Sequence, residues 1–230
     1  MIKWEKYWNT KPGTFHKTDY FRQVGKTIHG EPVSQSQFDC LISEILCQLN
    51  LKSDDTVLDL CCGNGVITNE LASHCKQVVG IDFSKQLIEI ANRDHRPDNV
   101  SYQCASVLEL GFTTFPTIRF NKVVLYDALQ YFRKSDLASI LKRIISVSTE
   151  PRRILFGGVP HLQRKSKFYD TWKKRLLYQF RRITNKDLIG TWWTEDDFRR
   201  ACEALTLNCT FHDQSEGMYN GHFRFDITIF

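Results

Sequence analysis

Strand-like and helix-like segments alternate along this chain from residue 56 onward, and that alternation restricts its possible folds more than any other feature. The first unit is VLDLCCGNGVITNEL (57–71), an apolar strand, a turn containing Gly63 and Gly65, and a run with apolar residues at helical spacing. Strands that alternate with helices form parallel sheets, because each helix returns the chain to the start of the next strand. The sequence therefore predicts an α/β fold, a mostly parallel sheet between two layers of helices.

Individual elements follow from the same pattern. We expect strands at 56–62, 77–83, 100–106, 121–128 and 152–159, and helices at 36–49, 65–74, 84–93, 135–146 and after Thr194. Ser84, Ser135 and Thr194 precede helix-like runs and are expected to cap them, because their side chains can accept hydrogen bonds from free backbone amides. The final runs, LNCTFHDQ and FRFDITIF, are joined across the loop SEGMYNGH (215–222) and predict two antiparallel strands, a C-terminal hairpin at one edge of the sheet.

The composition is that of an ordinary globular protein. Of the 230 residues, 42% are hydrophobic and 25% are charged, as in typical soluble proteins. The N-terminal stretch MIKWEKYWNTKPG has no long apolar run, so we expect neither a secretory signal nor a transmembrane segment, and a cytoplasmic location. The eight cysteines form no C-x-x-C pair, so we expect no metal site.

The glycine turn predicts a ligand site. In an open parallel sheet, ligands bind beyond the carboxyl ends of the strands, where the strand order reverses. Gly63 and Gly65 allow close approach of the backbone and leave helix amides free. Asp82 ends the second strand 17 residues past Gly65, where its carboxylate can bind the two hydroxyls of a ribose. These features indicate a ligand that contains adenosine.

At these residues the chain resembles the class I S-adenosylmethionine-dependent methyltransferases, which have a Rossmann-like fold. Their first motif is an acid in the strand followed by G-x-G-x-G; here it is written Asp59-Leu60-Cys61-Cys62-Gly63-Asn64-Gly65, with Cys61 in place of the first glycine. VVGIDFS matches the second motif. The resemblance implies S-adenosyl-L-methionine as cofactor. It implies cofactor contacts from Asp59, Cys61, Gly63, Gly65, Asp82, Phe83, Ala105, Ser106 and Tyr126, with Ser106 where the family often has an acid.

On this basis we expect one methyltransferase domain spanning 1–230. Its segments are an N-terminal helical lid region (1–55), a cofactor-binding core (56–160), a basic insertion (161–190) and a C-terminal helix and hairpin (191–230). The N-terminal aromatic residues are expected either to cover the cofactor or to pack in the core. They are Trp4, Tyr7, Trp8, Phe15, Tyr20 and Phe21.

Two other nucleotide sites fit the sequence less well. A nicotinamide dehydrogenase needs a third small residue where this chain has Thr68, and it usually lacks an acid at the position of Asp59. VGKT (24–27) resembles part of a phosphate loop, but the glycine required five residues before Gly25 is Tyr20. We therefore interpret this match as a coincidence.

Methyl transfer from a sulfonium is an in-line displacement, which a protein accelerates mainly by aligning the acceptor and removing its water. A general base is needed only if the acceptor must lose a proton. Tyr126, Asp127 and His161 are the candidate catalytic residues, because they follow the fourth and fifth strands. His161 is the first to test as a base, since imidazole titrates near neutral pH. Asp127 is alternatively expected to hold the methionine amino group or to orient the acceptor.

The basic insertion holds the positive excess of the chain. Residues 161–186 contain nine Lys and Arg and one acid, Asp170, whereas the rest contains 22 Lys and Arg and 25 Asp and Glu. A solvated helix face, a cap over an anionic acceptor, and contact with nucleic acid or an anionic membrane all remain open.

The nature of the acceptor is expected from what the sequence lacks. No D-P-P-Y-like segment and no Pro-Cys nucleophile is present, so we do not expect a nucleic acid. We expect methyl transfer to oxygen or nitrogen of a small acidic or sugar-related molecule. The alternatives are an RNA-directed methyltransferase and a non-catalytic cofactor-binding interaction module.

Overall fold

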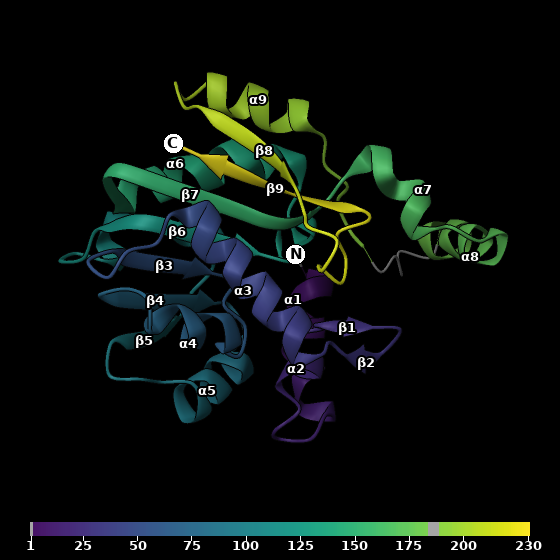
Figure 1. Ribbon diagram of the computed structural model, residues 1–230, viewed down its shortest axis with the longest axis horizontal. Coiled ribbons are helices and arrows are strands. Elements are labelled where there is room, and N and C mark those ends of the chain that lie inside the picture. The colour runs from purple at the N-terminus through teal and green to yellow at the C-terminus, as the bar shows by residue number, and fades with distance from the viewer. Residues whose placement is uncertain (1, 184–188) are drawn as a thin grey trace.

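The computed structural model describes residues 2–183 and 189–230. Within these residues, seven strands form one sheet in the order β5-β4-β3-β6-β7-β9-β8 (Figure 1). The strands are β3 (Thr56–Leu60), β4 (Gln77–Asp82), β5 (Val100–Cys104), β6 (Phe120–Tyr126), β7 (Ser148–Pro160), β8 (Cys209–Asp213) and β9 (Arg224–Ile229). Strands β3 to β7 pair in parallel with one another, and β9 is antiparallel to both of its neighbours, β7 and β8. The predicted mostly parallel sheet with an antiparallel C-terminal edge is confirmed.

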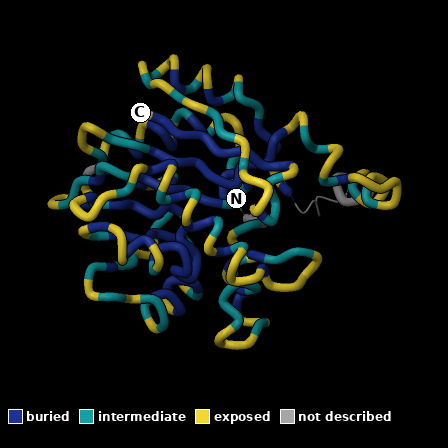
Figure 2. The backbone as a smooth tube through the Cα atoms, in the orientation of Figure 1, coloured by how far each residue is buried: buried dark blue, intermediate teal, exposed yellow. Residues whose placement is uncertain are grey.

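Helices cover both faces of the sheet. The longer ones are α3 (Gln35–Leu49), α4 (Val66–Ala72), α5 (Lys85–Asp94), α6 (Leu137–Val147) and α9 (Glu195–Glu203). Successive strand residues point to opposite faces: Val57 packs with α3 and α4, whereas Leu58 packs with α6 and α9. The strands are therefore buried on both sides (Figure 2), and the predicted three-layer sandwich is confirmed.

Helix caps agree with the sequence at two of three positions. Ser84 Oγ accepts a hydrogen bond from Leu87 N, and Thr194 forms a reciprocal capping box with Asp197. The predicted cap at Ser135 is wrong. Ser135 lies inside a short 3₁₀ helix, η5 (Lys134–Asp136), and α6 begins at Leu137 without a side-chain cap. The link between β8 and β9 is a loop over 214–223, within one residue at each end of the predicted loop SEGMYNGH (215–222).

Two further segments lie beyond the carboxyl ends of the parallel strands (Figure 1). The N-terminal segment comprises α1 (Ile2–Trp8), η1 (Pro12–Thr14), α2 (Tyr20–Gln23), β1 (Thr27–Ile28) and β2 (Glu31–Pro32). The second segment follows β7 and comprises η6 (Leu162–Arg164), α7 (Lys165–Phe168) and α8 (Trp172–Ile183). Short 3₁₀ helices η2 (Val107–Glu109), η3 (Phe112–Thr114) and η4 (Leu129–Tyr131) follow β5 and β6. In the described part of the chain, no helix combines the length and apolarity needed to span a bilayer.

Candidate functional site

The turn after β3 is tied to the carboxylate that ends β4. Gly63 N donates to Asp82 Oδ2 over 3.0 Å, and Ser84 N donates to Asp82 Oδ1 over 2.8 Å. Burial raises the pKa of Asp82 to about 6, although the amides of Ser84 and Gly63 favour the charged form. Each carboxylate oxygen has two lone pairs, so Asp82 can still accept hydrogen bonds from a ligand.

The backbone of this turn explains its glycines. Gly63 and Gly65 have φ of +60° and +83°, a region that residues with a Cβ seldom adopt. A Cβ on Gly63 would lie 2.9 Å from Val24 Cγ1, and one on Gly65 would overlap the Tyr102 hydroxyl. Cys61 also has a positive φ, +59°. A glycine, as in the motif that the chain resembles, would suit this left-handed conformation. Cys61 adopts the same conformation although it carries a side chain.

Asp59 lies behind the turn. Its Oδ2 accepts a 2.6 Å hydrogen bond from Thr68 Oγ1, which links β3 to α4. Burial raises the pKa of Asp59 to about 7, against the hydrogen bond from Thr68 and the charge of Lys26. The motif acid thus contacts the helix that follows the turn.

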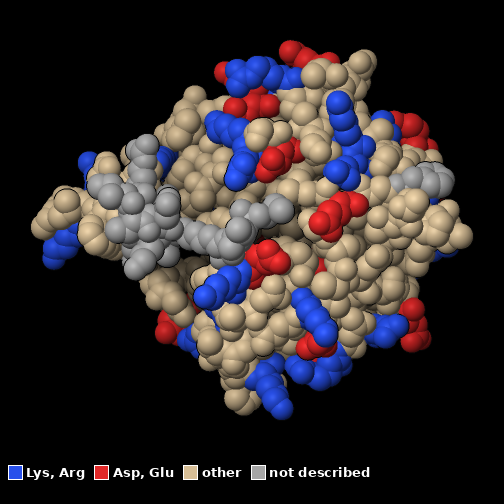
Figure 3. Space-filling view, turned by 180° about the vertical axis from the view of Figure 1, so that it is seen from behind, with Lys and Arg blue, Asp and Glu red and all other residues tan. Residues whose placement is uncertain are grey.

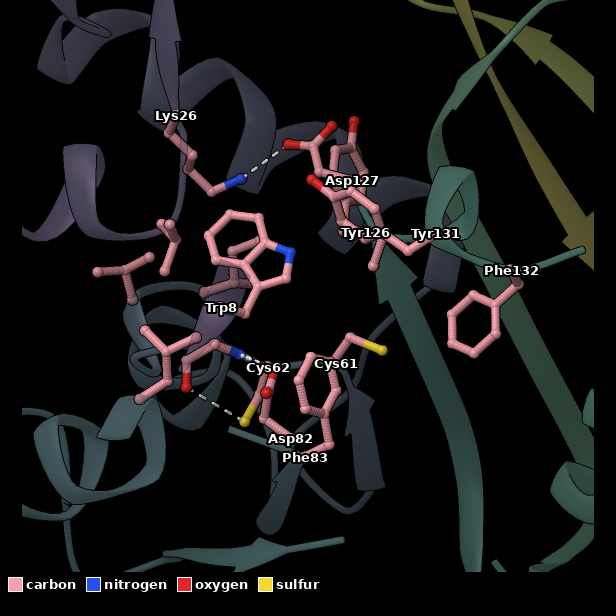
Figure 4. A pocket seen from close by; sticks show the side chains of 16 residues that line it. Trp8, Lys26, Cys61, Cys62, Asp82, Phe83, Tyr126, Asp127, Tyr131 and Phe132 are labelled. Atoms are coloured by element: carbon pink, nitrogen blue, oxygen red, sulfur yellow. Dashed lines mark hydrogen bonds and ion pairs between the residues drawn. The ribbon is translucent and has the colours of Figure 1, made fainter. Parts of the chain in front are cut away.

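Asp127 is the centre of an ionic network at the end of β6. Its Oδ2 accepts a hydrogen bond from Lys26 Nζ over 2.9 Å (Figure 4). The same oxygen accepts a 2.7 Å hydrogen bond from Tyr219 Oη, and Asp127 Oδ1 lies 3.3 Å from Arg224 Nη1. Burial raises the pKa of Asp127, but Lys26, Arg224 and the Tyr219 hydroxyl outweigh it and hold the pKa below its ordinary value. Asp127 is therefore ionised at neutral pH and already paired.

Three cavities meet around these residues. An inner cavity of about 80 Å³ lies between the glycine turn, Asp82 and Asp127, with the Trp8 indole at its centre (Figure 4). A side cavity of about 580 Å³ shares Cys61, Phe83, Tyr131 and Phe132 with it. An outer cavity of about 700 Å³ lies between the N-terminal segment, α7 and α8, and shares Trp8, Val24, Asp127 and Tyr131 with the inner cavity. The three cavities therefore adjoin one another at the carboxyl edge of the sheet.

The comparisons with known proteins identify the family. A family model described as a methyltransferase domain matches residues 57–150. The solved structure of magnesium protoporphyrin IX methyltransferase from Synechocystis PCC 6803 with bound S-adenosylmethionine has the same fold, with a TM-score of 0.63 at 13% identity over 99% of this chain and 95% of that one. Residues 57–150 thus match a methyltransferase domain, and the fold is that of the class I S-adenosylmethionine-dependent methyltransferases.

Curated relatives match this chain over shorter stretches. An uncharacterized methyltransferase, C70.08c of Schizosaccharomyces pombe, is 53% identical over 51 residues, which are 22% of this chain and 20% of that protein. The 23S rRNA (uracil(1939)-C(5))-methyltransferase RlmD of Legionella pneumophila (strain Paris) is 27% identical over 146 residues, 62% of this chain and 29% of that protein. Magnesium-protoporphyrin O-methyltransferase of Rhodobacter capsulatus is 35% identical over 89 residues, 38% of each. The chain thus spans about a fifth to two fifths of the length of these relatives.

Most of the residues expected from the methyltransferase motifs lie together. Cys61, Gly63, Asp82, Phe83, Tyr126 and Asp127 line the inner cavity. Ala105 and Ser106 line the side cavity, where Ser106 caps η2 through Leu108 N. Gly65 is placed beneath the turn as the N-terminal residue before α4, and like Asp59 it does not line the inner cavity.

His161 is placed apart from this group. Its buried ring packs edge-on against Phe225, with ring centroids 4.6 Å apart, and its Nδ1 accepts a hydrogen bond from Gln163 N. Burial and Arg164 lower the pKa of His161. The ring lines neither the inner nor the outer cavity. A catalytic role for His161 remains a prediction without support from its position.

The N-terminal aromatic residues divide between the two expected roles. Trp8 lines both the inner and the outer cavity, and its carbonyl oxygen accepts a hydrogen bond from Ser84 Oγ. Tyr20 and Phe21 instead pack against the core cluster around α3. The segment is anchored by Asn64 Nδ2, which donates to Gln23 Oε1 at 2.9 Å. It therefore covers the glycine turn and packs in the core at once.

Sequence reasoning missed three partners of Asp127. Lys26 comes from the loop before β1, Tyr219 from the long loop before β9, and Arg224 from β9 itself. A signal existed for Arg224, because its charge lies between Phe223 and Phe225 at the start of the predicted final strand. No local signal marked Lys26 or Tyr219, since their contact with Asp127 depends on the folding of distant segments onto one edge.

Proposed function

We propose that this protein transfers a methyl group from S-adenosylmethionine to an oxygen or nitrogen of a small anionic acceptor in the outer cavity. The carrying observation is that the inner cavity, which contains the family motif, adjoins a cavity of about 700 Å³ through a shared wall. This volume is in the range of small-molecule sites in proteins.

The cofactor fits the residues around the inner and side cavities. Asp82 has lone pairs left for ribose hydroxyls, and Phe83 offers a flat surface toward the side cavity, where Ala105 and Ser106 would receive the adenine. Lys26 and Asp127 provide one charge of each sign for the zwitterionic methionyl end. The bound cofactor supplies the electrophilic methyl group; these side chains hold and orient it.

Charge and shape of the outer cavity support an anionic acceptor. Its charged lining consists of Lys11, Lys167, Lys174, Arg224, Asp127 and Asp170. Asp127 is neutralised by its ion pairs and Asp170 pairs with Lys174. Lys11 and Lys167 form no ion pair with an acid in the described part of the chain. Positive charge therefore remains for an acidic group.

Tyr126 and Asp127 are proposed to position the reactants. Burial raises the pKa of the Tyr126 hydroxyl well above its ordinary value, so the group stays protonated. Asp127 accepts hydrogen bonds from two partners and is not free to take up a proton. An acceptor that is already ionised needs no base, so alignment and exclusion of water carry the reaction. For a protonated acceptor, His222 in the outer cavity is better placed than His161.

RNA is the second candidate acceptor, because the RlmD relative matches the longest stretch of this chain among the relatives described above. Its support is weaker, since the outer cavity, of about 700 Å³, has the size of a small-molecule site.

The test measures cofactor binding and turnover separately. Calorimetry should show micromolar binding of S-adenosylmethionine to the wild type, and Asp82→Ala and Lys26→Ala should each weaken it at least about tenfold, as expected for a lost charged hydrogen bond. Lys17→Ala, at an exposed position, is the control.

Turnover is then assayed with methyl-labelled cofactor on separated pools of small acidic metabolites, neutral metabolites and RNA. Label transfer to the acidic pool supports the proposal. Transfer to RNA alone establishes the second candidate, and cofactor binding without transfer to any pool indicates an interaction module.

A further inference from the structure

Helix α8 (Trp172–Ile183) projects from the body of the molecule with apolar side chains exposed. In Figure 1 it forms the extension at the right, and in Figure 2 much of its backbone belongs to exposed residues. Trp172, Leu176 and Phe180 are 70%, 65% and 64% exposed. Large apolar side chains are rarely clustered in this way on a soluble surface unless the surface binds something.

These three side chains share one face of the helix. They are spaced four residues apart, so they lie one above another along the axis. The opposite face is anchored: Tyr178 stacks on Tyr169 with ring centroids 4.5 Å apart, and it lines the outer cavity together with Lys174. The exposed apolar face is therefore the side of α8 that is turned away from the protein.

Cations border the exposed face. Lys173 follows Trp172 directly, with its Nζ 5.8 Å from the centre of the Trp172 ring, and Arg175 lies three residues beyond Trp172. From behind, the projection at the left edge shows blue Lys and Arg atoms next to tan side chains (Figure 3). The only acid within 161–186 is Asp170, which pairs with Lys174. An apolar strip bordered by positive charge has the pattern of a helix that lies in a membrane interface.

We propose that the exposed face of α8 binds the surface of an anionic lipid bilayer, with Trp172, Leu176 and Phe180 in the headgroup and acyl boundary and the bordering cations on lipid phosphates. A bilayer fits better than RNA, because the aliphatic Leu176 lies between the two aromatic rings and offers no surface for base stacking. It fits better than a second copy of the chain, because two copies would bring like charges together.

The position of α8 links this contact to the outer cavity. Lys174, Leu177 and Tyr178 line that cavity from the same helix whose outer face would lie on the bilayer. An amphiphilic acceptor could then pass between membrane and cavity along α8. This consequence rests on the proposed function, whereas membrane binding does not.

Vesicle co-sedimentation of the full-length protein tests the proposal. One set of vesicles contains phosphatidylcholine alone, and the other contains about one third phosphatidylglycerol. We expect binding to the anionic vesicles, weakened by salt, and little binding to the neutral ones. Leu176→Glu and Phe180→Glu should each reduce binding about tenfold or more. Leu162→Glu, at a residue 42% exposed on η6, should bind as the wild type does.

Tryptophan fluorescence gives a second readout that does not depend on stability. Emission should shift to shorter wavelength on anionic vesicles, and Trp172→Phe should lose the shift while it still sediments with them. Unchanged circular dichroism and S-adenosylmethionine binding in each variant show that the fold is intact. Equal vesicle binding by wild type and Leu176→Glu overturns the proposal. So does wild-type binding to RNA but not to vesicles, or a dimer that Leu176→Glu dissociates.

Discussion

Cys61 stands where the glycine motif of the methyltransferases has its first glycine, and its backbone still has the positive φ that suits glycine. Its φ of +59° places a Cβ in the left-handed region, which costs a residue with a side chain about 1 kcal/mol or more. Cys61→Gly should therefore be more stable than Cys61→Ala by about 1 kcal/mol. Both variants lose the thiol, but only glycine adopts the left-handed backbone conformation without steric strain. Urea unfolding of the two variants measures the difference.

The same pair of substitutions at Cys47 gives the control. Cys47 is exposed within α3, where the backbone is right-handed. There Ala should be more stable than Gly by about 1 kcal/mol. If Gly were the weaker residue at both positions, the φ of Cys61 would not be a source of strain.

Asp82 should make cofactor binding depend on pH. Its pKa, raised by burial to about 6, means that the carboxylate becomes protonated as the pH falls below about 6. A neutral carboxyl group is a weaker acceptor for ribose hydroxyls. We expect the affinity for S-adenosylmethionine to fall between pH 7.5 and pH 5.5. Asp82→Asn should bind weakly at both values and change less between them. Calorimetry at the two pH values checks this, and a wild-type affinity that is flat across the range contradicts it.

At the scale of elements, Thr194 and Ser135 were both predicted as helix caps, but only Thr194 caps a helix. Thr194 Oγ1 accepts a hydrogen bond from Asp197 N, and the Asp197 carboxylate accepts one from Thr194 N, so both amides at the start of α9 are satisfied. Thr194→Ala should cost about 1 kcal/mol of unfolding free energy. Ser135→Ala, at an exposed residue that caps no helix, should change it by less than about 0.5 kcal/mol. Equal losses of unfolding free energy in the two variants would show that the capping box does not stabilise the protein.

How far the sequence predicts the fold depends on which interactions define an element. Apolar runs bounded by turn residues placed β3, β4 and β6 within about two residues, because burial on both faces of a parallel sheet leaves an unmistakable pattern. The predicted cap at Ser135 was wrong because a 3₁₀ turn precedes α6. A shift of the helix start by one residue is enough to move a side chain out of the capping position. The loop between β8 and β9 was predicted within one residue at each end, because polar and glycine residues separate the two strand-like runs.

The site follows the same division. Gly63, Asp82 and Asp127 were predictable because they follow strands whose carboxyl ends meet at one edge. Lys26 lies 101 positions before Asp127 in the sequence, and Tyr219 comes from the other end of the chain. Such contacts arise from tertiary packing, which no local pattern encodes. His161 is the opposite case. It follows a strand and its residue type suits a general base, but its ring packs inward against Phe225.

At the scale of the whole molecule, buried acids make the free energy of unfolding depend on pH. Burial raises the pKa of Asp59 to about 7 and those of Asp82 and Asp226 to about 6. An acid whose pKa is higher in the folded state binds its proton more tightly there. Its contribution is therefore complete below the ordinary value near 4 and is lost as the pH rises through the folded-state value. Asp127, whose pKa is lowered, contributes in the opposite sense, and its stabilisation is lost only in acid.

Asp59→Asn isolates one of these contributions. Between pH 5 and pH 8, ionisation of a group with a folded-state pKa of about 7 should remove about 2–3 kcal/mol from the wild-type unfolding free energy. The asparagine variant cannot ionise, so its unfolding free energy should fall by that much less over the same range. Asp54→Asn, at an exposed position, should follow the wild type. Urea unfolding at both pH values measures all three proteins. If the wild type and Asp59→Asn change in parallel, Asp59 is already ionised in the folded protein at pH 5, and burial behind the glycine turn does not hold its proton.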